Sequence, residues 1–213
     1  MKHFVAATLL HVAGSLLVLG AQTHPTVVYT EGDVRVDGEE VYIGQRVEAG
    51  SWIQTGSDGY CEVQFEGPNI IQFQPDTVAR LSVSAAGRDL DLRTGSVGMV
   101  LDRLQTISQN VSGGFAVRTP TAVAGVRGTA FFIKVESQNS TYVCTCNGVL
   151  EQSTSESSDF VTVEAHHHEA FRFSAEGGEI VRRPAPTLYH SDEHMDLLAE
   201  KVGVTIPWGR IEE

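Results

Sequence analysis

Apolar and polar residues alternate along most of the chain between residues 27 and 181. Cys61, Val63 and Phe65 fall on one face of such a segment, and the polar residues between them fall on the other. A two-residue period over many short segments is typical of half-buried β-strands. The pattern therefore predicts strands over residues 27–181. The residues it expects to be buried together are Val63, Phe65, Leu92, Val117, Phe131 and Ile133.

Turn-forming residues separate these segments, as in Asp37-Gly38 and Thr94-Gly95. Asn147-Gly148 is the strongest hairpin signal, because both residue types tolerate a positive φ, and it predicts a reversal of the chain there. Many short strands joined by turns predict an all-β fold. Two architectures fit this pattern, an antiparallel sandwich and a short solenoid-like β domain.

One segment near the C-terminal end has the pattern of a helix. Ser191 is suited to cap a helix over residues 191–201, and Gly203 is suited to end it. The acidic residues Asp192 and Glu193 suit the positive N-terminal end of that helix. The apolar positions that fall along one face are Met195, Leu198 and Val202. We therefore expect a single C-terminal helix.

The composition supports a folded, acidic protein. Of the 213 residues, 41% are hydrophobic and 20% are charged, so a packed core is feasible. The net charge of −12 repels phosphate backbones. We therefore expect no nucleic-acid partner.

The N-terminal residues have the features of an export signal. Lys2 precedes an apolar run over residues 4–19, and the small residues Gly20 and Ala21 follow it. The prediction is a signal peptide over residues 1–21, cleaved after Ala21, and a mature protein in the periplasm. The alternative is an uncleaved run that anchors the chain in the membrane. That alternative is the one case in which we expect membrane association.

A series of short motifs follows in order between Val28 and about Val149. They are Gly32-Asp33-Val34-Arg35-Val36, Val47-Glu48-Ala49-Gly50, Ile53-Gln54-Thr55-Gly56, Cys61-Glu62-Val63-Gln64-Phe65, Leu92-Arg93-Thr94-Gly95-Ser96-Val97, Phe115-Ala116-Val117-Arg118-Thr119-Pro120 and Gly125-Val126-Arg127-Gly128-Thr129. In order and spacing this series resembles the FecR domain. The resemblance suggests a division into a FecR-like β domain over 27–150 and a C-terminal β extension with a short helix over 151–213.

The resemblance implies an extracytoplasmic β domain, which in some family members relays a signal from an outer-membrane transporter to a sigma factor. Only Met1-Lys2-His3 precede the apolar run here, whereas such regulators carry a cytoplasmic segment at that point. We therefore expect no direct contact with a sigma factor. The expected partner is another extracytoplasmic protein or a component of the cell envelope.

Two cysteines lie close together on one predicted strand. Cys144 and Cys146 are two residues apart, so their thiols point to the same face. Neighbouring thiols can bind a soft or borderline metal ion or form a reducible disulfide. An oxidised or buried pair with a purely structural role is also open, since exported proteins favour disulfides.

Histidines are concentrated in the last quarter of the chain. His167 and His168 lie on a predicted strand, and His190 lies just before the predicted helix. Imidazole and thiolate together are a suitable ligand set for Zn or Cu. The candidate metal ligands are therefore Cys144, Cys146, His167, His168 and His190. The alternative for the histidine segment is an ordinary solvated polar strand.

Sequence signatures of the common enzyme classes are absent. The chain has no Gly-x-Ser-x-Gly, no phosphate-binding Walker loop, no His-Glu-x-x-His and no dinucleotide fingerprint. We therefore expect a non-catalytic binding or sensory module with no catalytic residues. The alternative is a metal-binding or thiol-redox protein that uses Cys144, Cys146 and the C-terminal histidines.

Overall fold

The computed structural model describes residues 24–84, 87–101 and 115–209. The strands are β1 (Thr26–Glu31), β2 (Val34–Val36), β3 (Glu39–Glu40), β4 (Ser51–Thr55), β5 (Tyr60–Phe65), β6 (Asn69–Phe73), β7 (Val78–Ser84), β8 (Gly87–Leu101), β9 (Phe115–Arg118), β10 (Ala122–Ser137), β11 (Ser140–Thr154), β12 (Val161–Ala165), β13 (Glu169–Glu176) and β14 (Glu179–Ala185), and the helix is α1 (Asp192–Glu200). The predicted all-β chain with one C-terminal helix is confirmed in this coarse form.

The predicted signal peptide over residues 1–21 lies outside the described residues. Within the part that is described, no helix has both the length and the apolar character needed to cross a membrane.

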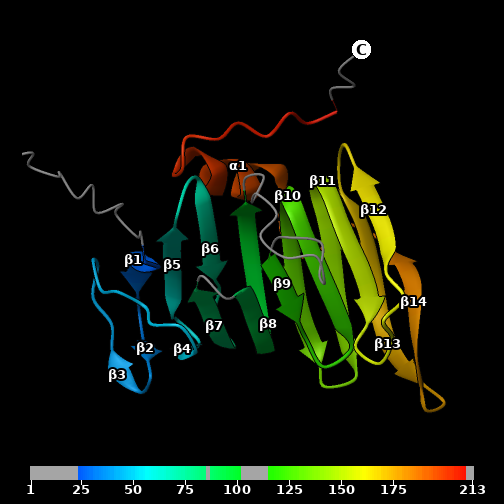
Figure 1. Ribbon diagram of the computed structural model, residues 1–213, viewed down its shortest axis with the longest axis horizontal. Coiled ribbons are helices and arrows are strands. Elements are labelled where there is room, and N and C mark those ends of the chain that lie inside the picture. Colours follow the sequence, from blue (N-terminus) through cyan, green and yellow to red (C-terminus); the bar gives the residue numbers. More distant parts are fainter. Residues whose placement is uncertain (1–23, 85–86, 102–114, 210–213) are drawn as a thin grey trace, which may run out of the picture.

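Three long strands organise the sheet, because each of them changes partners along its length. β8 pairs with β7 over its first part and with β6 and β10 over its last part. In the same way β10 pairs with β9 and then β8, and β11 pairs with β13 and then β12. The pairings therefore form two branches that share these three strands (Figure 1). The pairings between described strands are antiparallel, except that β8 and β9 pair in parallel.

One hydrophobic core contains side chains from both branches. Phe131 on β10 and Leu90 on β8 belong to it, and both are fully buried. The six residues expected to be buried together, Val63, Phe65, Leu92, Val117, Phe131 and Ile133, are all members. Cys61 also lies in this core, where its thiol has no solvent access. The two-residue period thus predicted the inner face of the sheet correctly.

The predicted hairpin at Asn147-Gly148 is wrong. Both residues lie inside β11, which continues to Thr154 and pairs with β10 on either side of them. The pairing register shifts at this point, since Ala130 opposes Asn147 while Phe131 opposes Thr145. Gly148 has a φ of 108°. The positive φ that suits a turn is used here in an irregular part of a continuous strand.

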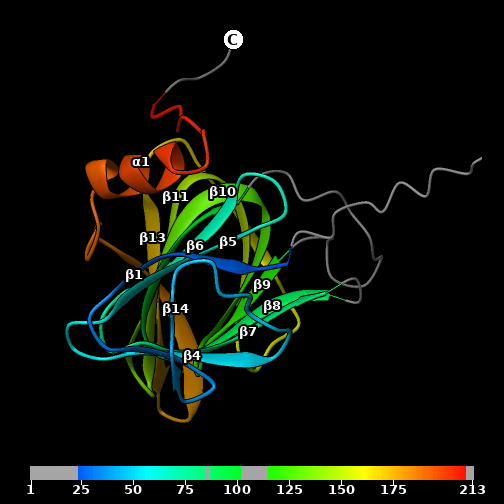
Figure 2. The ribbon, with the colours of Figure 1, turned by 90° about the vertical axis from the view of Figure 1, so that its left-hand side faces the viewer.

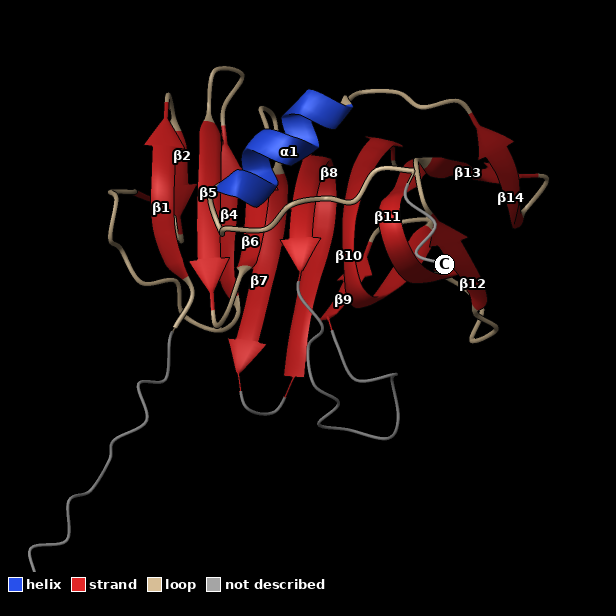
Figure 3. Cartoon of the chain, turned by 90° about the horizontal axis from the view of Figure 1, so that it is seen from above, coloured by secondary structure: helices blue, strands red, loops and turns tan. Residues whose placement is uncertain are grey.

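The helix and the residues around it cover the outer face of the sheet. α1 crosses that face near one end of β6, β8 and β10 (Figures 1, 2 and 3). Its side chains Met195 and Leu198 are fully buried and form a second hydrophobic cluster with Phe132 and Cys144. Alternation alone places Phe132 on the solvent side of β10. Phe132 is buried because the C-terminal segment lies over it.

The helix lies where it was predicted, with each limit within one residue of the expected 191–201. α1 begins after Ser191, whose Oγ accepts a hydrogen bond of 3.2 Å from the backbone N–H of His194. Gly203 follows the helix with a φ of 71°, and the N–H of Val204 bonds back to the carbonyl of Ala199. This is a helix end stabilised by a glycine with positive φ. At the other end of the helix, the cap at Ser191 fixes the position of the chain just before α1, where His190 lies.

A candidate metal centre beneath the C-terminal segment

Cys144 and Cys146 lie where β11 changes partners. Cys144 pairs with Ala170 of β13, whereas Gly148 pairs with Ala165 of β12. Both thiols are fully buried and belong to the cluster on the outer face of the sheet. The expectation that the two side chains share one face is therefore confirmed. The register between β10 and β11 shifts beside Cys146, between the pairs Phe131–Thr145 and Ala130–Asn147.

The histidine-rich segment is a bend and not the predicted strand. Residues 166–168 connect β12 to β13, and His168 has a φ of 44°. The backbone N–H of His168 donates to the carbonyl of Cys146 over 2.9 Å, which holds the bend against β11. The His168 side chain is only 6% exposed. This bend, and not strand alternation, turns the His168 ring toward the cysteines.

His190 reaches the same place from the C-terminal segment. Its ring stacks on Phe132 with a centroid distance of 4.6 Å and an interplanar angle of 12°. Its Nδ1 lies 2.8 Å from the carbonyl oxygen of Leu188. The N–H of Leu188 is itself bonded to the Tyr142 hydroxyl at 3.0 Å. Stacking and hydrogen bonding together fix the His190 ring with its Nε2 toward the sheet.

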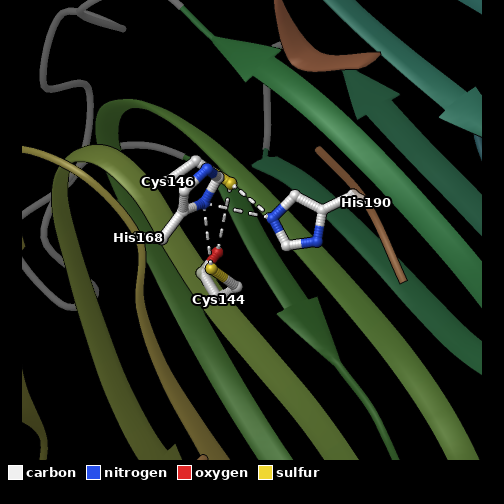
Figure 4. Close-up of side chains that lie close together, drawn as sticks. All are labelled: Cys144, Cys146, His168 and His190. Atoms are coloured by element: carbon white, nitrogen blue, oxygen red, sulfur yellow. Dashed lines mark hydrogen bonds between the residues drawn. The ribbon is translucent and has the colours of Figure 1, made fainter. Parts of the chain in front are cut away.

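Four side chains from three parts of the chain meet here (Figure 4). One ligand atom from each of Cys144, Cys146, His168 and His190 lies within 4.8 Å of the other three. The shortest sulfur–nitrogen distances are 3.2 Å from Cys146 Sγ to His190 Nε2 and 3.6 Å from Cys144 Sγ to His168 Nδ1. His190 Nε2 and His168 Nδ1 are 3.3 Å apart. The predicted proximity of both sulfurs to histidines of the C-terminal part is confirmed.

The electrostatic environment makes the two thiols different. A hydrogen bond from Cys146 lowers the pKa of Cys144, with help from His168 and His190 and against the effect of burial. Burial, together with the neighbouring Cys144, raises the pKa of Cys146. Burial works to lower the pKa of His168, but Cys144 and Asp192 outweigh it and the pKa is raised. The same contacts therefore favour the thiolate form of Cys144 and the protonated form of His168.

Asp192 has a role that the sequence did not indicate. Its Oδ1 accepts from His168 Nε2 at 2.6 Å, and its Oδ2 lies 3.0 Å from His167 Nε2. The hydrogen bond from His168 lowers the pKa of Asp192. As the first residue of α1, Asp192 was expected to serve only as a helix-start charge. It instead connects the helix to the histidine bend.

The remaining candidate, His167, lies outside the four-residue cluster, and so does the neighbouring His194. His167 is half exposed and contacts Asp192 and the ring of Trp208. His194 points toward β6, where its Nε2 bonds to Gln72, and burial lowers its pKa. His167 thus belongs with His168 and Asp192 in a second, more exposed group.

An ion pair between a buried carboxylate and a partly exposed lysine holds the far end of the helix. Glu62 on β5 is completely buried, and both of its carboxylate oxygens accept from Lys201 Nζ, at 2.6 and 2.7 Å. Alternation placed Glu62 on the outer face of its strand. Because the C-terminal segment covers that face, the carboxylate is out of contact with water and Lys201 supplies the opposite charge. No local sequence signal connects the two residues, which are 139 positions apart.

Part of the chain matches a known protein family. Residues 51–151, from the start of β4 into β11, match the family described as FecR protein. The chain contains a FecR domain. This domain supplies Cys144 and Cys146, whereas His168, His190 and Asp192 come from beyond the matched range. The candidate metal centre is therefore built jointly by the FecR domain and the residues that follow it.

Two crystal structures of a protein from Parabacteroides distasonis ATCC 8503, described provisionally as an anti-sigma factor, are similar to part of the chain. Each has 18% sequence identity and a TM-score of 0.48, and the alignment covers 62% of this chain. The chain spans 59% of the length of that protein. Comparison with curated proteins found no match.

Proposed function

We propose that the protein is an exported, non-catalytic sensory or binding module that contacts another extracytoplasmic protein or a component of the cell envelope. The observation that carries the proposal is the FecR domain over residues 51–151, which fits a regulatory or sensory module. The predicted signal peptide over residues 1–21 supports placement in the periplasm.

The geometry of the site supports binding over catalysis. A nucleophilic cysteine must reach its substrate, but Cys144 and Cys146 are both fully buried beneath the C-terminal segment. The rings of His168 and His190 cover them further. A buried group of thiols and imidazoles is better suited to hold an ion than to turn over a substrate.

For the architecture, we propose the antiparallel sandwich over the solenoid-like domain. The support is the single core that takes side chains from both branches of the sheet, such as Phe131 and Ile53. We also propose that the chain divides near residue 150 into a FecR-like β domain and a C-terminal extension. β11 runs across that boundary, and β12, β13 and β14 extend the same sheet.

Cell fractionation and mass spectrometry of the protein from its native cells test the proposal. The expected result is a periplasmic chain that begins at Gln22, which crosslinks in intact cells to an envelope protein. A chain that keeps Met1 and sediments with the membranes would show that residues 4–19 are an anchor. A chain recovered in the cytoplasm, or crosslinked directly to a sigma factor, would overturn the proposal.

A further inference from the structure

The four-residue cluster has the dimensions of a tetrahedral zinc site. Zn–S bonds of roughly 2.3 Å and Zn–N bonds of roughly 2.0–2.1 Å give tetrahedral edges of about 3.6 Å between sulfur and nitrogen and about 3.3 Å between two nitrogens. The observed sulfur–nitrogen distances are 3.2 and 3.6 Å, and the nitrogen–nitrogen distance is 3.3 Å. All remaining pairs lie within 4.8 Å. An ion at the centre therefore needs only small side-chain movements.

The hydrogen bonds around the cluster direct the correct ring atoms inward. The carbonyl oxygen of Leu188 can only accept, so Nδ1 of His190 carries a proton and Nε2 offers its lone pair to the centre. The carboxylate of Asp192 likewise accepts a hydrogen bond from Nε2–H of His168, which leaves the lone pair of Nδ1 for the metal ion. A carboxylate or carbonyl behind each ligating histidine is the arrangement found in metal sites.

The surroundings favour a closed, structural site. The two sulfurs are fully buried, and Phe132 packs against the His190 ring. Two thiolates and two imidazoles fill all four tetrahedral positions, so no position remains for a water or a substrate. A tetrahedral set of two sulfurs and two nitrogens is typical of Zn²⁺.

We propose that Cys144, Cys146, His168 and His190 bind one Zn²⁺ ion, with Asp192 and the Leu188 carbonyl as the groups that orient the two imidazoles. Zn²⁺ takes the place of the Cys146 thiol proton and of the one proton between Cys144 and His168, and both protons are released to the solvent on binding. It also joins β11, the bend at residues 166–168 and the segment before α1. The ion thereby fastens the C-terminal segment to the FecR domain.

Zinc titration against a chromophoric chelator, with the reduced full chain and matched variants, tests this assignment. The native protein should bind one zinc per chain. His190→Gln and Cys146→Ser should each weaken the affinity by about a hundredfold or more, and Asp192→Asn should weaken it by about tenfold to a hundredfold. Two controls should bind zinc as the native protein does. His166→Gln makes the same substitution at an exposed ring outside the cluster, and Cys61→Ala removes the cysteine of the inner core.

Cobalt substitution of the native protein gives a result that does not depend on how well the variants fold. Co²⁺ should produce thiolate-to-metal charge-transfer absorption, and zinc should displace it. The assignment is overturned if the reduced native protein shows no such absorption, or if folded Cys146→Ser binds zinc as tightly as the native chain. Uptake of Cu⁺ with no uptake of zinc would also overturn it. So would a Cys144–Cys146 disulfide that the protein keeps in its native compartment.

Discussion

Leu198→Ala tests whether the C-terminal helix is packed on the FecR domain as described. The Leu198 side chain is fully buried, and a β-carbon added at Gly98 would lie 3.5 Å from its Cδ2. Gly98 belongs to β8 and pairs with both β6 and β10, so the backbone there cannot collapse into a cavity. Substitution of a buried leucine that leaves an unfilled cavity costs about 3 kcal/mol, which is about a hundredfold in an equilibrium constant.

Hydrogen exchange of the α1 amides measures this cost directly, because a nine-residue helix depends on packing for its stability. The exchange rates over residues 192–200 should rise by about a hundredfold in Leu198→Ala. Leu197→Ala is the matched control, since Leu197 is the preceding residue and its side chain is 54% exposed. Equal effects of the two substitutions would refute the described packing of the helix.

Two further predictions concern charged pairs. Hydrogen bonding from Arg172 holds the pKa of Glu136 at about 2, below its usual 4.5, so the carboxylate stabilises the fold above pH 4.5 and loses this effect as the pH falls toward 2. In urea unfolding, the stability lost in Glu136→Gln should therefore be largest above pH 4.5 and vanish near pH 2. A loss that is independent of pH would contradict this. Lys201→Met should destabilise the protein by about 3 kcal/mol, because it leaves the buried Glu62 carboxylate without its opposite charge. Glu62→Gln should cost less, because the Lys201 left without a partner in that variant can turn to water. Thermal unfolding that ranks the two variants in the opposite order would contradict the described burial.

The inner face of the sheet could be predicted from the sequence, but its outer face could not. Alternation identified Phe131 and Ile133 as core residues because strand side chains alternate strictly between the two faces. The same rule placed Phe132 and Glu62 in solvent, although both are buried. What covers the outer face is a segment distant in the sequence, and local periodicity contains no information about such a contact. The helix limits were predictable because its cap is local.

The sequence predicted which residues form the candidate site better than it predicted the backbone conformation that brings them together. The spacing of Cys144 and Cys146 correctly placed both thiols on one face. The expected hairpin and histidine strand were both wrong, since Gly148 serves a continuous strand and residues 166–168 form a bend. Asp192 was assigned only to the helix start, because its contact with His168 depends on tertiary structure.

X-ray absorption spectroscopy at the zinc edge tests the central claim most directly, because it measures the ligand shell of the bound ion. The zinc-loaded native protein should show two sulfur ligands at roughly 2.3 Å and two nitrogen ligands at roughly 2.0–2.1 Å. His190→Gln should lose one of the two imidazole contributions while both sulfurs remain. A shell that contains only nitrogen and oxygen would contradict the account, because zinc would then be bound away from Cys144 and Cys146.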